Sequence, residues 1–144
     1  ELTDLLKPAN PEVIPPPVTV DPANYVEDWK LGDFANDLGP TLTERDLKSG
    51  QKAFHQAACA ACHRVAGDPA TTNAVLGPDL SGVGSRFDPR ALLESIIHPS
   101  LVIGEKYRNP AGPNVSSMPP GLINGLEKEQ VLDLIAYLAG QTIE

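Results

Sequence analysis

The sequence predicts an all-α fold of three main helices joined by long loops and preceded by an extended, proline-rich arm. Three segments of the 144-residue chain repeat apolar residues at helical spacing, and no run alternates apolar and polar residues over the length of a strand. Apolar residues make up 41% of the chain, but aromatic residues make up only 5%. A core with so few large rings is easier to build around a bulky group that is not protein.

We expect residues 1–40 to form the arm and residues 41–144 to form the folded domain. Six of the 15 prolines lie between Pro8 and Pro22, and proline favours an extended conformation, so this stretch predicts a stiff linker. The arm also carries most of the negative charge, with eight acidic residues against two lysines. Trp29, the only tryptophan, is expected to anchor the arm to the domain.

The first two helices are predicted from their start signals. The first is expected to begin near Thr43, because Thr43 to Asp46 resembles a capping box with Asp in place of Glu. Its stripe of apolar or small residues consists of Leu47, Gly50, Phe54 and Ala57. The second is expected to begin at Asp88-Pro89, an N-cap followed by proline, and to end before Pro99. Its buried side chains would be Leu92, Leu93, Ile96 and Ile97.

The third helix is predicted from about Glu127 to Ala139, with Gly140 as its stop signal. The residues expected on its buried face are Val131, Leu134, Ile135 and Leu138. Residues 109–125, before this helix, are rich in proline and glycine and are expected to form a loop without strands.

Composition argues against two classes of partner. The net charge of −8 makes a nucleic-acid partner unexpected, because phosphate binding needs clustered lysine and arginine. No apolar run reaches the roughly 18 residues that a membrane span needs. Because the chain opens at Glu1 without a methionine or a signal-type apolar region, we expect a mature form or an excised piece.

The run Cys59-Ala60-Ala61-Cys62-His63, expected at the end of the first helix, is the C-x-x-C-H pattern of covalent c-type haem attachment. Residues three and four apart on a helical turn share a face. Cys59 and Cys62 can therefore reach the two vinyl groups of one porphyrin edge and form thioethers. His63 can then lie beneath the ring and bind the iron. The motif predicts one haem c.

Three other interpretations of the cysteine pair are weaker. A thioredoxin-type site needs a βαβ context, which this sequence lacks. A zinc site usually needs a second pair of ligands, and only His55 and His98 remain. A disulfide across a two-residue gap in a helix has poor geometry.

Met118, the only methionine, is the candidate for the sixth ligand of the iron. It is flanked by serine and proline residues in a loop, a poor place for core filler and a good place for a rigidly held ligand. A thioether favours ferrous iron and raises the reduction potential. His55 is a weaker candidate because it lies on the helix that carries the attachment motif. His98 is expected to have a capping or surface role.

Two further residues are candidates around the haem. A metal-bound histidine normally donates its other ring N–H to a fixed acceptor, and the carbonyl of Pro78 is the candidate for His63. Arg86 is a candidate partner for a haem propionate, with a solvated surface arginine as the alternative. The glycine-rich run from Leu76 to Gly84 lacks the preceding strand and the following lysine of a nucleotide loop.

Taken together, C-A-A-C-H, G-P-D-L and S-M-P-P-G-L make residues 41–144 resemble a class I cytochrome c. The resemblance implies three main helices around a covalent haem, with the first and last crossing near it, where Gly50 allows close approach and Phe54 and Tyr137 pack around it. It assigns Cys59 and Cys62 to the thioethers, His63 and Met118 to the iron, and Pro78 to the proximal hydrogen bond.

A narrower resemblance covers about residues 24–140. It shares the run Met118 to Leu122 and adds Tyr25-Val26-Glu27-Asp28-Trp29 and Gly84-Ser85-Arg86-Phe87. These runs are similar to the haem-binding domain of the Pirellula/Verrucomicrobium type, which usually ends large secreted proteins. In such domains a longer, strand-rich insertion commonly separates the tyrosine matched by Tyr107 from the methionine loop. Here only ten residues lie between Tyr107 and Met118.

The expected function is a bacterial monohaem cytochrome that shuttles single electrons in the periplasm or elsewhere outside the cytoplasm, and not an enzyme. Its partners would be a redox donor and acceptor, with a fused dehydrogenase domain implied by the narrower resemblance. The alternative is a haem protein with an open or labile sixth site, such as a gas sensor or a peroxidase-like enzyme. The sequence offers no acid–base pair beside Met118 for peroxidase chemistry.

Overall fold

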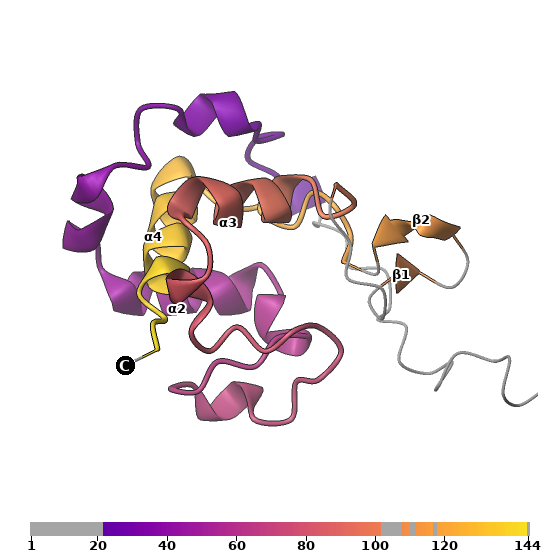
Figure 1. Cartoon of the computed structure of the whole chain (residues 1–144). Coiled ribbons are helices and arrows are strands. Elements are labelled where there is room, and N and C mark those ends of the chain that lie inside the picture. Colours follow the sequence, from indigo (N-terminus) through magenta and orange to yellow (C-terminus); the bar gives the residue numbers. More distant parts are fainter. Residues whose placement is uncertain (1–21, 102–107, 110–111, 117, 144) are drawn as a thin grey trace, which may run out of the picture.

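The computed structural model describes residues 22–101, 108–109, 112–116 and 118–143. In this part of the chain, three α-helices surround the apolar core (Figure 1): α2 (Leu47–Gln56), α3 (Pro89–Ile97) and α4 (Lys128–Ala139). Short 3-10 turns lie before α2 and between α2 and α3. The predicted all-α fold is confirmed. The predicted proline-rich linker lies, apart from Pro22, outside the described residues.

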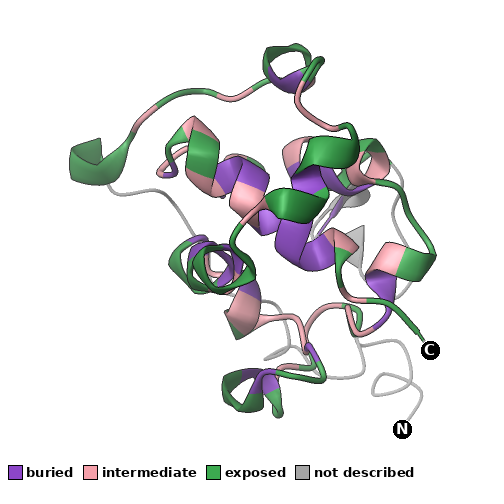
Figure 2. Ribbon diagram, turned by 90° about the vertical axis from the view of Figure 1, so that its left-hand side faces the viewer, coloured by how far each residue is buried: buried purple, intermediate pink, exposed green. Residues whose placement is uncertain are grey.

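The buried residues gather where the helices meet, and α4 contributes more of them than α2 or α3 (Figure 2). Seven of its twelve residues are buried, including all four that the sequence predicts for its inner face. The largest side chains with almost no exposed surface are Phe34, Phe54, Leu93, Ile123, Leu134 and Ile135. Only two of these are aromatic, as expected from the composition.

Helices α2 and α4 cross in close contact at Gly50. A Cβ atom on Gly50 would lie 2.2 Å from the carbonyl oxygen of Asp133 and 2.5 Å from Cβ of Tyr137. The ring of Phe54, one helical turn later, packs against the ring of Tyr137 with centroids 5.7 Å apart. The close approach that the resemblance implies is therefore present, and it depends on a residue without a side chain.

Helix α2 begins later than the sequence predicts. The Asp46 carboxylate accepts hydrogen bonds from the N–H groups of Lys48 and Ser49, so Asp46 is the N-cap and the predicted start near Thr43 is wrong. Residues 40–44 form a separate 3-10 turn that begins at a proline. Leu47, predicted on the buried stripe, is 51% exposed because it lies in the first turn, before the crossing.

Helices α3 and α4 begin and end where the sequence predicts. Asp88 caps α3 by accepting the N–H of Ala91 at 2.8 Å. At the start of α4, the N–H of Glu127 donates to the side chain of Gln130 at 2.8 Å, and Gly140 follows the last helical residue. Strong local signals at both ends of each helix fix these boundaries.

Residues before α2 also belong to the packed structure. Phe34 is fully buried, and Leu42 is 5% exposed. The indole N–H of Trp29 donates to the carbonyl of Leu126 at 2.9 Å, which confirms that Trp29 anchors the arm. The domain boundary at residue 40 stays a prediction.

A short hairpin interrupts the segment predicted to lack strands. Strands β1 (Arg108–Asn109) and β2 (Gly112–Ser116) pair antiparallel, with Arg108 opposite Ser116, and they project to one side of the helices (Figure 1). Strands of two and five residues are too short to show a reliable alternation in the sequence. The prediction of a loop without strands is therefore wrong. Tyr107 lies outside the described residues.

Candidate functional site

The C-x-x-C-H motif forms a 3-10 turn of its own, Cys59–Ala61, rather than the end of α2. Ala58 adopts a left-handed conformation with φ of 64°, which ends the helical path. Within the turn, the N–H groups of Cys62 and His63 both donate to the carbonyl of Cys59, at 3.2 and 2.9 Å. The turn therefore brings the three residues of the motif together, although the predicted continuity with the helix is wrong.

Cys59 is buried and Cys62 is half-buried. Burial raises the pKa of Cys59 to about 12 and also raises the pKa of Cys62. Redox-active cysteine pairs depend on a lowered thiol pKa, so this environment argues against the thioredoxin-type interpretation. Among the described residues, no group of three or more His, Cys, Asp or Glu side chains is arranged to hold a metal ion.

His63 is oriented by the carbonyl group that the sequence predicts. Its Nδ1 atom donates a hydrogen bond to the carbonyl oxygen of Pro78 at 2.7 Å. Burial lowers the pKa of His63, and the hydrogen bond to Pro78 acts in the opposite direction. A neutral imidazole with its proton on Nδ1 leaves the lone pair of Nε2 free to bind a metal.

Backbone hydrogen bonds hold Pro78 in place beside His63. On one side, the N–H of Gly77 donates to the carbonyl of Cys62 at 2.8 Å. On the other side, the N–H of Leu80 donates to the carbonyl of Arg64 at 2.8 Å. The segments 62–64 and 77–80 therefore lie side by side, and the acceptor for His63 is fixed between two hydrogen bonds.

Side chains of the same two segments strengthen this pairing. Arg64 and Asp79, the residues that directly follow His63 and Pro78, form an ion pair at 3.0 Å. Hydrogen bonds from the Ser81 hydroxyl and N–H, and then the Arg64 pair, lower the pKa of Asp79. This pair was not predicted from the sequence. The available signal was an arginine directly after His63 and an aspartate directly after Pro78.

Gly77 is a second residue that the sequence analysis missed. A Cβ atom at this position would lie 2.6 Å from Cε1 and 2.8 Å from Nδ1 of His63. The absence of a side chain therefore leaves the space that the imidazole ring occupies. The available signal was a glycine directly before the predicted acceptor, Pro78.

Arg86 lies at the edge of the same loop. Its guanidinium donates to the carbonyl of Asp79 at 3.3 Å, and its side chain is exposed. This places Arg86 beside the residue that follows Pro78. Its pairing with a haem propionate stays a prediction.

Met118 comes from a different part of the chain, two residues after the end of β2. It is half-buried and packs against the apolar core. Its N–H donates to the hydroxyl of Ser116 at 3.1 Å, and the N–H of Ser116 donates to the hydroxyl of Ser100 at 3.0 Å. The backbone at Met118 is thus tied to the segment that follows α3.

The two remaining histidines, His55 and His98, contact residues outside the Cys59–His63 motif. Nε2 of His55 donates to the carboxylate of Asp68 at 2.6 Å, so this side chain is directed to the loop after the motif. His98 directly follows α3, its N–H donates to the carbonyl of Glu94 at 2.8 Å, and its side chain is exposed. The predicted capping or surface position of His98 is confirmed.

Comparison with known families identifies the chain. The family model described as Cytochrome c matches residues 47–142, from the start of α2 to just beyond the end of α4. The chain belongs to the cytochrome c family. It is a haem-binding electron-transfer protein, and this cytochrome c binds one haem c covalently through Cys59 and Cys62. No curated protein and no solved structure matches the chain.

The residues around the motif of this cytochrome c suit the haem. Two thiols are carried on one turn, and the neighbouring imidazole is held with its Nδ1 proton on Pro78. The ring of that imidazole rests against Gly77, where any side chain would collide with it. None of the helices among the described residues has the length and apolar character to cross a membrane.

Proposed function

We propose that this cytochrome c carries single electrons between redox proteins, with His63 and Met118 as the axial ligands of its haem iron. The bound haem supplies the chemistry, because its iron takes up and releases one electron. The observation that carries the proposal is the 2.7 Å hydrogen bond from Nδ1 of His63 to Pro78. This bond fixes the tautomer and the ring orientation that a proximal ligand requires.

The surroundings of Met118 support its assignment as the second ligand. Ser116 holds the backbone on one side, and Pro119-Pro120 follows on the other, where two rings restrict the φ angles. A half-buried thioether held in this way can face the iron with little loss of conformational entropy. A soft, uncharged sulfur ligand favours ferrous iron and raises the reduction potential.

The wider setting of the protein is also a proposal. We place it outside the cytoplasm, in a bacterial periplasm or in a secreted protein, as an electron-accepting domain that serves a dehydrogenase. Support comes from the narrower resemblance to the Pirellula/Verrucomicrobium type of haem-binding domain. Two runs that carry this resemblance, Tyr25 to Trp29 and Met118 to Leu122, belong to segments that contact each other: Val26 donates to the carbonyl of Asn124 at 2.8 Å.

A redox titration followed by absorption spectroscopy tests the proposed function. We expect a low-spin haem that titrates as a single one-electron couple, and a lower potential in Met118→Ala because the soft ligand is lost. His98→Ala, a change at an exposed histidine after α3, is the matched control and is expected to keep the wild-type potential. A high-spin ferric protein that turns over peroxide would contradict the proposal and favour an open sixth site.

A further inference from the structure

The segment Tyr25–Phe34, here called the strap, is hydrogen-bonded to the turn that follows Met118. The N–H groups of Val26 and Glu27 both donate to the carbonyl of Asn124, at 2.8 and 3.3 Å. The N–H of Trp29 donates to the side-chain Oδ1 of Asn124 at 3.3 Å. Asn124 therefore accepts hydrogen bonds from the strap through both its backbone and its side chain.

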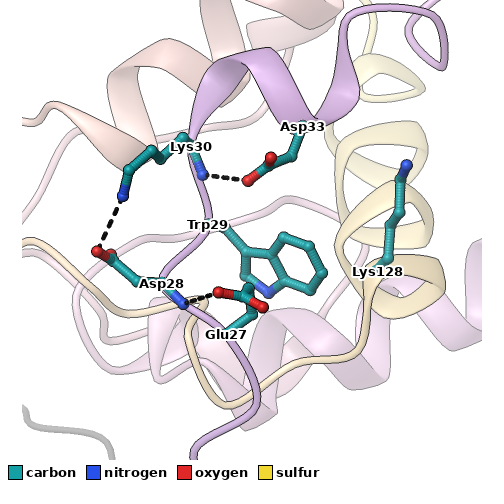
Figure 3. Close-up of a pocket in the computed structure, with 6 residues that line it drawn as sticks. All are labelled: Glu27, Asp28, Trp29, Lys30, Asp33 and Lys128. Atoms are coloured by element: carbon teal, nitrogen blue, oxygen red, sulfur yellow. Dashed lines mark hydrogen bonds and ion pairs between the residues drawn. The ribbon is translucent and has the colours of Figure 1, made fainter.

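The strap is itself anchored in the core. The ring of Trp29 packs against the fully buried Phe34, with centroids 5.3 Å apart, and its indole N–H donates to Leu126. Figure 3 shows the Trp29 ring turned toward the start of α4, where Lys128 lies. Lys128 lies 5.8 Å from the centre of the Phe34 ring and also pairs with Asp37 at 3.0 Å. The strap can thus resist movement of the turn that it holds.

The chain between Met118 and Asn124 is short and has few freely rotating backbone torsions. Pro119 and Pro120 have restricted φ angles, and Gly121 begins a turn closed by the N–H of Asn124, which donates to its carbonyl at 3.1 Å. A displacement of Asn124 is therefore transmitted through a short and stiff connection to Met118. On the other side of the methionine, the Ser100–Ser116 hydrogen bond provides the second anchor.

We propose that Trp29 and Asn124 are positioning residues that keep the Met118 sulfur on the haem iron. The inference rests on the proposed assignment of Met118 as an axial ligand. Without the strap, the turn would move more freely, and the fraction of molecules with Met118 away from the iron would rise. An added ligand binds only to those molecules, so its apparent affinity reports that fraction.

Imidazole added to the ferric holoprotein is the probe. Asn124→Ala removes the side-chain acceptor, and Trp29→Phe removes the indole donor but keeps a ring against Phe34. Asn124→Asp keeps an acceptor oxygen and serves as the conservative variant. Asp46→Ala removes the N-cap of α2, whose carboxylate bonds Lys48 and Ser49, and is the control for a general loss of stability.

We expect Asn124→Ala and Trp29→Phe each to raise the apparent imidazole affinity about fivefold, the effect of one lost hydrogen bond. Asn124→Asp and Asp46→Ala are expected to stay within about twofold of the wild type. Equal affinities in the two strap variants and the wild type would overturn the inference. An equal rise in Asp46→Ala would also overturn it, because general destabilisation would then explain the effect.

The same samples separate this inference from the proposed function. A ferric wild type with a sulfur-to-iron absorption band but unchanged affinities in the strap variants contradicts the strap alone. A ferric wild type without that band contradicts Met118 as a ligand and, with it, the role of the strap.

Discussion

Nδ1 of His63 lies 2.7 Å from the carbonyl oxygen of Pro78, and two backbone hydrogen bonds between the segments 62–64 and 77–80 fix that distance. A carbonyl can only accept, so the proton is on Nδ1 and the lone pair is on Nε2. A backbone carbonyl alone thus sets the tautomer of the His63 imidazole. Because the acceptor is uncharged, this hydrogen bond does not place a carboxylate beside the haem.

The first prediction concerns the glycine that makes room for this imidazole. Gly77→Ala would place a Cβ atom 2.6 Å from the His63 ring, so the ring or the backbone at residue 77 must move. We expect a loss of about 1–3 kcal/mol in the free energy of unfolding, measured in guanidinium chloride, because of overpacking. The NMR resonance of the Nδ1 proton in the reduced protein should shift.

Gly67→Ala is the matched control for this change, because nothing lies within 4 Å of a Cβ at that position. We expect its unfolding midpoint to stay close to that of the wild type. If Gly77→Ala were as stable as the control and kept the same Nδ1 resonance, the contact between Gly77 and His63 would not matter.

The second prediction concerns the crossing of α2 and α4. Gly50→Ala would place a Cβ atom 2.2 Å from the backbone carbonyl of Asp133, which has no freedom to rotate away. The helices must separate, and we expect the free energy of unfolding to fall by about 3 kcal/mol. Urea unfolding of Gly50→Ala and of Gly32→Ala, which has open space at its Cβ, measures the difference. Equal unfolding midpoints in the two variants would show that the crossing tolerates a side chain.

Local signals explain how much of the fold the sequence predicts. The N-cap Asp88 with the following Pro89, and the C-cap Gly140, are specific signals for helix ends. The start of α3 and the end of α4 are therefore predicted correctly. The start of α2 offers two capping residues, Thr43 and Asp46, and the capping-box pattern favours Thr43. The proline at position 40 instead directs the first of them into a 3-10 turn.

The contacts that the sequence could not predict are formed between distant segments. Nothing in the residues around Phe34 shows a helical or alternating period, yet this ring is fully buried. The partners of Asn124 lie almost a hundred residues earlier, at Trp29 and its neighbours. The attachment motif and the Pro78 acceptor were predicted because their chemistry is local, whereas the iron-binding role of Met118 stays a prediction.

The third prediction concerns the pairing of His55 with Asp68. Burial alone would raise the pKa of Asp68, but hydrogen bonds from His55, Gln51 and the N–H of Ala70 outweigh it and lower that pKa. The unfolded chain therefore binds this proton more readily. The carboxylate stabilises the fold above about pH 4, and this contribution is lost as the pH falls through the lowered pKa.

Urea unfolding between about pH 6 and pH 3 measures this contribution. We expect the stability of the wild type to fall more steeply on acidification than that of Asp68→Asn, which cannot take up the proton. Glu44→Gln, a change at an exposed carboxylate, should keep the wild-type slope. Identical slopes in the wild type and Asp68→Asn would contradict the assigned role of the pair.

The most direct test of the account is the near-infrared absorption of the ferric protein, with and without the Met118 sulfur. We predict a weak sulfur-to-iron charge-transfer band in the wild type and its complete loss in Met118→Ala, with the covalent haem retained in both. A wild-type spectrum without the band, or a band that persists in Met118→Ala, would contradict ligation by His63 and Met118.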